Sequence, residues 1–321
     1  MAIADVVVQS IAGIVKEDKK LVYHLLYYSL IEAILVLSIP LASSFVINSV
    51  LSHADISIFV LGFVVISLFV IVTILLVVKE YIVEKFQQKI FMSTAIDIVE
   101  KLSEPEFAKR EKDAEFKKYL NYFFDITAIQ KFFPVLLLDG FALIAKILVS
   151  LILLWLFDSA LFFTGFLSLA IYIVILLILG KRGVRYAIAR SDAKHSAIYY
   201  LQNINSLPGS RDEKLAAFDE KLSTYARARQ ALFGTTIRQL ALTYFTEGAV
   251  FSGFLVVGGY LVVEGAIPVG EFIASEIVVV SITYALKGFV KQLDYVYDTV
   301  EGFYKVEKLS RTVREKGDQY A

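Results

Sequence analysis

Three runs without a charged side chain, residues 33–54, 56–78 and 159–180, constrain the fold more than any other feature of the sequence. Each run has at least the roughly 20 residues that an α-helix needs to cross a bilayer. Further apolar stretches carry isolated charges, and 57% of the 321 residues are hydrophobic, which is not typical of a soluble domain. We predict an all-α membrane protein with six transmembrane helices, over residues 22–52, 56–78, 132–157, 159–180, 239–263 and 266–288.

Basic residues fall on alternate connections between these spans. Three precede the first span, ten lie in residues 79–131, eleven in residues 181–238 and seven after residue 286, whereas the intervening short connections have none. Lys146 is the one basic residue left outside these four groups. Because basic residues near span ends are retained in the cytoplasm, we expect a multi-pass protein of the inner (plasma) membrane with both termini cytoplasmic.

Two of the cytoplasmic connections are long enough to form helical arms. Residues 63–104 contain neither Gly nor Pro, and a helix of that length reaches about 63 Å, roughly twice the bilayer core of about 30 Å. We therefore expect cytoplasmic arms over residues 79–131 and 181–238, the second unbroken until Leu207. An interfacial elbow helix (1–20), a transmembrane domain (21–294) and a cytoplasmic C-terminal helix and tail (295–321) complete the predicted organisation.

Several stretches resemble the transmembrane domain of ABC exporters, in particular the type I secretion and bacteriocin-export branch. Residues 40–61 (PLASSFVINSVLSHADISIFVL) are similar to its first outer turn. Residues 105–130, with PEFAKR and DITAIQ, are similar to its first coupling helix and the return to span 3. Residues 258–309 (GGYLVVEGAIPVGEFIASEIVVVSITYALKGFVKQLDYVYDTVEGFYKVEKL) give the strongest match. The resemblance implies the type I exporter fold, a domain-swapped dimer with a second copy or a paralogue, and ATP-driven export.

The sequence differs from that family because it lacks the motif that binds the phosphates of a nucleotide. The 321 residues contain no GxxxxGK[ST] motif, so no backbone cradle for a triphosphate is expected in them. They also lack Cys, the nucleophile of the peptidase domain that precedes some bacteriocin exporters. We expect this chain to be no enzyme and to bind no cofactor, with ATP and Mg²⁺ held by a separate ATPase subunit. Family analogy adds a periplasmic adaptor protein as a further candidate partner.

The tips of the two arms are the predicted contacts with that ATPase, because the resemblance places coupling helices there. The alternative is two solvated helix turns without a partner. The candidate coupling residues are Glu106, Phe107, Lys109 and Arg110 in the first arm, and Ser206, Leu207, Pro208, Gly209 and Arg211 in the second.

Four charges inside the spans, Asp139, Lys146, Glu247 and Glu276, are candidate residues of a translocation cavity. Charged side chains are costly inside a bilayer and seldom face lipid. Asp139 lies two helical turns before Lys146 on nearly the same face, and Glu247 and Glu276 are other possible partners of Lys146. Ion pairs that fix helix register would satisfy the same energetics, so both interpretations stay open.

The remaining chemistry excludes several function classes. Without Cys there is no thiolate metal site or disulfide, and the three His residues show no metal-ligand spacing. The net charge of zero gives no sign of the basic surface that a nucleic-acid-binding protein needs. Two rivals to an exporter subunit remain: a proton-driven transporter of the same fold that needs no ATPase, and a membrane scaffold that transports nothing. The substrate cannot be read from the sequence.

Overall fold

The computed structural model describes residues 19–53, 58–103 and 138–297, and all regular structure in these ranges is helical. The expected elbow over residues 1–18, the first arm tip with Glu106, Phe107, Lys109 and Arg110, and the tail from residue 298 lie outside the described residues. The described helices are α2 (Lys19–Val36), α3 (Ser38–Leu51), α4 (Ile58–Leu102), α8 (Phe141–Phe157), α9 (Ser159–Gly180), α10 (Gly183–Gln202), α11 (Arg211–Val263) and α12 (Val269–Lys291).

Within the described ranges, six helical stretches are long and apolar enough to cross a membrane, which confirms the prediction of an all-helical chain with six candidate spans. The first stretch, Val22–Leu51, combines α2 and α3, and the fourth, Ser159–Gln202, combines α9 and α10. The other four stretches belong to α4, α8, α11 and α12.

The first span consists of two successive helices, α2 and α3. Leu37 has a turn conformation between the two helices, and Pro40 occupies the first turn of α3. Proline has no backbone N–H and its ring crowds the preceding turn, so helices commonly bend near it. The span predicted over residues 22–52 corresponds to the helical stretch Val22–Leu51, within which Leu37 separates α2 from α3.

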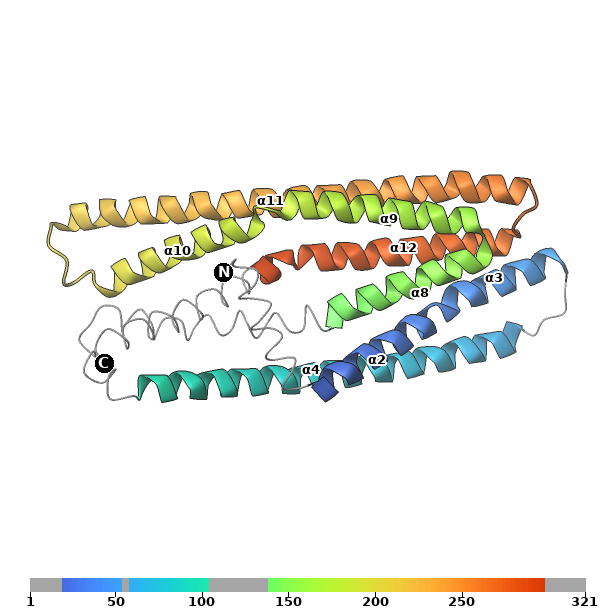
Figure 1. Cartoon of the computed structure of the whole chain (residues 1–321), viewed down its shortest axis with the longest axis horizontal. Coiled ribbons are helices and arrows are strands. Elements are labelled where there is room, and N and C mark those ends of the chain that lie inside the picture. The colour runs from blue at the N-terminus through green and yellow to red at the C-terminus, as the bar shows by residue number, and fades with distance from the viewer. Residues whose placement is uncertain (1–18, 54–57, 104–137, 298–321) are drawn as a thin grey trace, which may run out of the picture.

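Helix α4 is the long helix expected from the stretch without Gly or Pro. It runs for 45 residues from Ile58 to Leu102, which corresponds to about 68 Å at 1.5 Å per residue. Figure 1 shows α4 running along the lower side of the molecule and extending well past the start of α2. More than half of its length is therefore available to project beyond a bilayer core of about 30 Å.

The second arm is less regular than predicted. A turn at Lys181 and Arg182 separates α9 from α10, and α10 ends at Gln202, before the Pro and Gly residues of the tip. Helix α11 then returns without interruption for 53 residues. Figure 1 shows α10 and α11 side by side at the same end of the molecule as the C-terminal end of α4.

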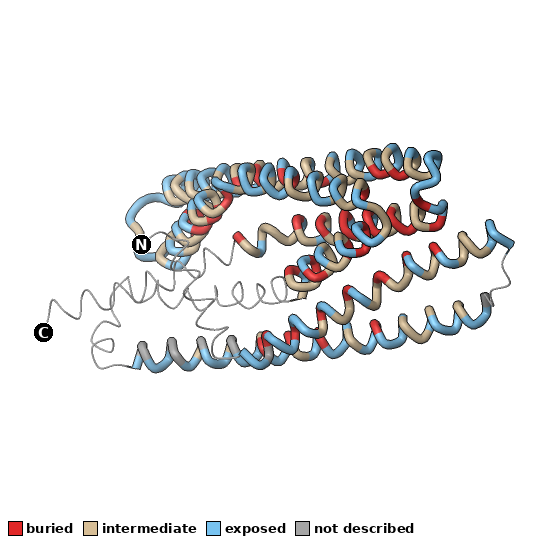
Figure 2. Tube along the Cα trace, turned by 45° about the vertical axis from the view of Figure 1, so that its right-hand side comes forward, coloured by how far each residue is buried: buried red, intermediate tan, exposed pale blue. Residues whose placement is uncertain are grey.

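Helix α12 is the central element of the bundle. It packs against α3, α8 and α11, and its buried residues recur along most of its length. Figure 2 shows buried positions concentrated where these helices meet, while most of α4 is exposed. The core is therefore formed around α12, and the outward faces of α4, α9 and α11 carry large exposed apolar side chains.

Candidate transport cavity

A cavity of about 270 Å³ lies between α2, α8 and α12. At about 30 Å³ per molecule in liquid water, this space holds a cluster of waters or a small organic group. Its polar lining comes from Glu32 on α2, Asp139 and Lys146 on or just before α8, and Gln292 after α12. Tyr284, Phe289 and small aliphatic side chains form the remaining walls.

Glu32 links this cavity to α4 through an ion pair. Lys79 Nζ donates a hydrogen bond to Glu32 Oε2 at 2.6 Å, and only 2% of the Lys79 side chain and 17% of the Glu32 side chain are exposed. The two residues are 47 positions apart in the sequence, and α2 packs against α4. A buried pair of this kind fixes the register of two helices, because removing either partner leaves an uncompensated charge.

Lys146 and Asp139 line the same cavity without forming an ion pair with each other. Lys146 is half-buried and lies close enough to the Glu32 carboxylate for an electrostatic attraction. No hydrogen bond or ion pair within 4.0 Å reaches Lys146 or Asp139 from the described part of the chain. Asp139 and Lys146 thus line the same cavity, as neighbours along the helix, without a direct contact between their charged groups.

Glu247 lies elsewhere and has its own partner. Lys287 Nζ on α12 donates to Glu247 Oε1 on α11 at 2.8 Å, and the same ammonium lies 5.4 Å from the centre of the Tyr244 ring. This pair joins two packed helices, which is the register role that the sequence analysis kept as an alternative. Glu247 is therefore not among the residues that line the cavity.

Glu276, on α12, is the fourth predicted charge. Both of its carboxylate oxygens are shielded from solvent and have no hydrogen-bond partner in the described structure. It does not line the charged cavity either. The structure thus places Asp139 and Lys146 in the lining of one cavity, and Glu247 and Glu276 at separate positions.

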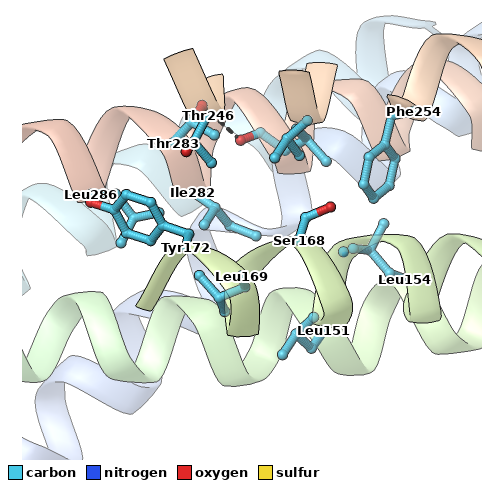
Figure 3. A pocket seen from close by; sticks show the side chains of 13 residues that line it. Leu151, Leu154, Ser168, Leu169, Tyr172, Thr246, Phe254, Ile282, Thr283 and Leu286 are labelled. Carbon is cyan, nitrogen blue, oxygen red and sulfur yellow. Dashed lines mark hydrogen bonds between the residues drawn. The ribbon is translucent and has the colours of Figure 1, made fainter. Parts of the chain in front are cut away.

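A second, smaller cavity lies within the apolar core. It has a volume of about 30 Å³, room for one water molecule by the same measure. Figure 3 shows Leu151, Leu154, Phe254 and Ile282 around it, with Ser168, Tyr172, Thr246 and Thr283 as the hydroxyl-bearing members. The Tyr172 hydroxyl forms a 2.9 Å hydrogen bond with the Thr243 hydroxyl. This space is too small for an organic substrate and is a packing defect of the core.

The tip of the second arm is exposed and held in a defined shape. Ser210 and Glu213 form a reciprocal capping box at the start of α11, and Gly209 has a φ of +116°, which favours glycine. Lys214 Nζ donates to the Ile204 carbonyl at 3.0 Å across the loop. The candidate coupling residues Ser206, Pro208, Gly209 and Arg211 are exposed, and Leu207 is half-buried.

A buried polar contact lies where α9, α10 and α11 meet the segment after α12. The Tyr297 hydroxyl donates to Gln239 Oε1 at 3.2 Å, and Gln239 Nε2 approaches the Leu176 carbonyl at 3.4 Å. A Cβ atom at Gly183 would overlap the Tyr297 ring. This contact was not predicted from the sequence, and the pair of glycines at positions 180 and 183 is the one signal there that could have indicated a close approach.

The structure also reveals charged partners that the sequence analysis missed. It predicted no role for Glu32 in a cavity and assigned Lys79 and Lys287 to cytoplasmic connections. Within the described residues, no group of three or more His, Asp or Glu side chains is placed to hold a metal ion.

A scan against models of known protein families finds no match, and a search of curated proteins finds no relative. The class of the protein therefore rests on its own features: an all-helical chain with six candidate membrane-spanning helices among the described residues, a partly charged cavity between three of them, and long helices that extend past the bundle at one end.

Proposed function

We propose that this chain is the membrane-spanning permease subunit of an ABC-type exporter. The observation that carries the proposal is the common direction of the long helices. Helix α4 and the pair of α10 and α11 extend from one end of the bundle, whereas the first residues of α4, α9 and α12 lie at the other end (Figure 1). Arms of this kind on one side of a bilayer suit a protein that receives force from a cytoplasmic motor. The resemblance of residues 40–61, 105–130 and 258–309 to exporter spans supports the same proposal.

In this proposal, ATP hydrolysis takes place on an ATPase outside these 321 residues. The exposed, capped tip around Pro208 contacts that ATPase, as does the first tip around Phe107. Two copies of the chain, or one copy and a paralogue, form a domain-swapped dimer of twelve spans in the inner membrane with cytoplasmic termini. The charged cavity of each copy then belongs to the translocation pathway.

A site-specific photo-crosslinker tests the proposed contact. The crosslinker is introduced at Pro208 or Arg211 in native membranes, and Ser223, an exposed residue on the shaft of α11, serves as the matched control position. We expect the two tip positions, but not position 223, to capture a protein with a P-loop nucleotide-binding motif, and we expect ATP with vanadate to change the yield. Equal capture at position 223, or capture of no P-loop ATPase at the tip, refutes the proposal.

A second candidate, a proton-driven transporter, is favoured by one observation. Glu276 has a carboxyl group buried in a span without a hydrogen-bond partner in the described structure, and intramembrane carboxyl groups serve proton transfer in many transporters. The test is proton uptake into proteoliposomes under an imposed pH gradient without ATP. Uptake that is lost in Glu276→Gln supports this candidate, and absence of uptake in the unmodified protein eliminates it.

A further inference from the structure

The charged cavity is lined by two carboxylates, those of Glu32 and Asp139, and by the ammonium group of Lys146. The ammonium groups of Lys79 and Lys146 both lie near the Glu32 carboxylate. Lys79 makes the direct 2.6 Å hydrogen bond to Glu32 and is itself almost completely buried. The carboxylate is thus already neutralised by Lys79, and the charge of Lys146 is left over.

Asp139 does not neutralise Lys146. It precedes Lys146 by seven residues, about 10 Å along a helix axis, and it is exposed at the edge of the cavity. No described carboxylate lies within 4.0 Å of the Lys146 ammonium. An ammonium group inside a span without a counter-charge is costly, so its presence next to open space indicates that an anionic group from outside the chain binds there.

The walls of the cavity indicate the chemistry of the part of the ligand that is not the anionic group. Tyr284, Phe289, Leu143 and Val36 provide aromatic and aliphatic surface around Lys146. A Cβ atom built at Gly288 meets no atom within 4 Å, so the space beside α12 is open. A small hydrated anion gains nothing from these walls, whereas an alkyl or aryl chain is removed from water against them.

We propose that this cavity binds an amphiphile with an anionic headgroup, a phosphate or a carboxylate, whose headgroup accepts hydrogen bonds from Lys146 and whose apolar part lies along Tyr284 and Phe289. This inference rests on the proposed function only in assigning the cavity to the transport pathway. The headgroup could belong to a membrane lipid or to a soluble amphiphile, and the shared chemistry is the anion attached to an apolar chain.

The test measures binding to the purified full chain in dodecyl maltoside micelles, without ATPase. Three probes are titrated at matched concentrations: dodecyl phosphate, dodecyltrimethylammonium and inorganic phosphate. We expect dodecyl phosphate alone to raise the melting temperature in a saturable way. Vesicles with and without phosphatidic acid, compared by retention of the lipid in native mass spectrometry, then distinguish a membrane lipid from a soluble amphiphile.

Two variants connect the binding to the cavity. Lys146→Met weakens dodecyl phosphate binding by about tenfold or more, because it removes a charge-assisted hydrogen bond, while Lys291→Met, at the exposed end of α12, leaves it unchanged. If Lys146→Met does not fold, Gly288→Leu gives the same loss by filling the cavity. Its matched control is Gly248→Leu, because a Cβ atom at Gly248 also meets open space, but Gly248 does not line the cavity.

Three outcomes overturn the inference: equal binding of dodecyl phosphate by Gly288→Leu and the unmodified chain, equal binding of the cationic probe, or equal binding of inorganic phosphate alone. None of these outcomes concerns the arm tips, so the permease proposal would stand. Conversely, failure to capture an ATPase at Pro208 would leave the result of the binding experiment unaffected.

Discussion

At the residue scale, the ion pair between Glu32 and Lys79 is the strongest single constraint on helix register. Only 2% of the Lys79 side chain is exposed, and a buried charge that loses its partner typically costs about 3 kcal/mol or more. We therefore predict that Lys79→Met and Glu32→Gln each lower the melting temperature of the purified protein. The measurement is thermal unfolding in detergent, followed by tryptophan fluorescence at Trp155.

The double variant Glu32→Gln with Lys79→Met is the control for that prediction. It replaces both charges by uncharged side chains of similar length, so no unpaired charge remains. We expect it to recover more than half of the stability lost in either single variant. Additive losses in the double variant would show that the two side chains are not coupled.

Gly183 allows the close approach of Tyr297, and a single methyl group tests this. Alanine normally stabilises a helix relative to glycine by up to about 1 kcal/mol, but the Cβ atom at this position would overlap the buried Tyr297 ring. We predict that Gly183→Ala lowers the melting temperature, whereas Gly248→Ala, with open space around its Cβ position, maintains or raises it. An equal effect of the two substitutions would contradict the proposed packing.

Tyr297 should also make the protein sensitive to alkaline pH. Burial raises the pKa of the Tyr297 phenol above its ordinary value, and the nearby Asp294 carboxylate raises the pKa further, against the lowering effect of the hydrogen bond to Gln239. Below pH about 10 the phenol is protonated in both the folded and unfolded states. Above that pH the unfolded chain releases the proton first, so the stability contributed by the neutral phenol is lost as pH rises.

We accordingly predict that the difference in melting temperature between the unmodified protein and Tyr297→Phe narrows between pH 9 and pH 11, on either side of the phenol's usual pKa of about 10. Phenylalanine lacks the hydroxyl, so the variant loses the hydrogen bond to Gln239 at every pH but has no proton to release. A difference that stays constant over this range would show that Tyr297 titrates normally.

Two ion pairs could have been predicted from the sequence by counting residues outward from the turn between two adjacent spans. Glu32 lies 23 positions before Asp55 and Lys79 lies 24 positions after it, so both reach the same depth in two spans that fold back at that turn. Glu247 and Lys287 are each 20 positions from Ile267, the residue between α11 and α12. Lys146 is 12 positions before Asp158, and the residue 12 positions after it is Ala170, so the same arithmetic gives Lys146 no partner.

At the element scale, the start of α11 determines the shape of the second arm tip. The Glu213 backbone N–H donates to Ser210 Oγ, and the Ser210 backbone N–H donates to Glu213 Oε2. Loss of an N-cap typically costs about 1 kcal/mol. We predict that Ser210→Ala increases amide hydrogen exchange in the first turn of α11 by several-fold without changing exchange in the spans.

Ser223→Ala is the matched control for the capping prediction, because Ser223 is an exposed residue of α11 three turns beyond its start and caps no helix end. Its exchange rates at the tip should equal those of the unmodified protein. The same result for Ser210→Ala would mean that the crossing contacts, such as that from Lys214 to the Ile204 carbonyl, hold the tip without the cap.

The sequence predicted some elements well and others poorly, for physical reasons. Long apolar runs identify helices because every backbone polar group inside a bilayer must be bonded within its own segment, and this rule placed α4 and α12. The turn at Lys181 and Arg182 could not be predicted in this way. It coincides with the packing of Tyr297 against Gly180 and Gly183, a contact between positions more than 100 residues apart in the sequence.

At the scale of the whole molecule, the apolar surface of the spans exceeds what one copy can bury. Large hydrophobic side chains remain exposed on α4, α9 and α11, including Phe59, Phe163 and Val263. In water such a surface would cause aggregation, whereas lipid or a second copy of the chain covers it in a bilayer. This excess of exposed apolar surface fits a chain whose helices lie in a membrane.

The last prediction concerns the orientation of the six spans in the membrane. It can be tested with single introduced cysteines, because the sequence has no Cys of its own. Single cysteines replace Ser52 and Glu264, exposed at the outer turns, or Ser103 and Ser206, exposed at the ends of the described arms. Positive residues flank only the arm side of the spans, so the arms should be cytoplasmic. In intact cells, a membrane-impermeant maleimide should therefore label positions 52 and 264, whereas positions 103 and 206 should react only after the membrane is opened. Labelling of positions 103 and 206 in intact cells would place the arms outside, where no cytoplasmic ATPase could reach them, and the permease proposal would have to be abandoned.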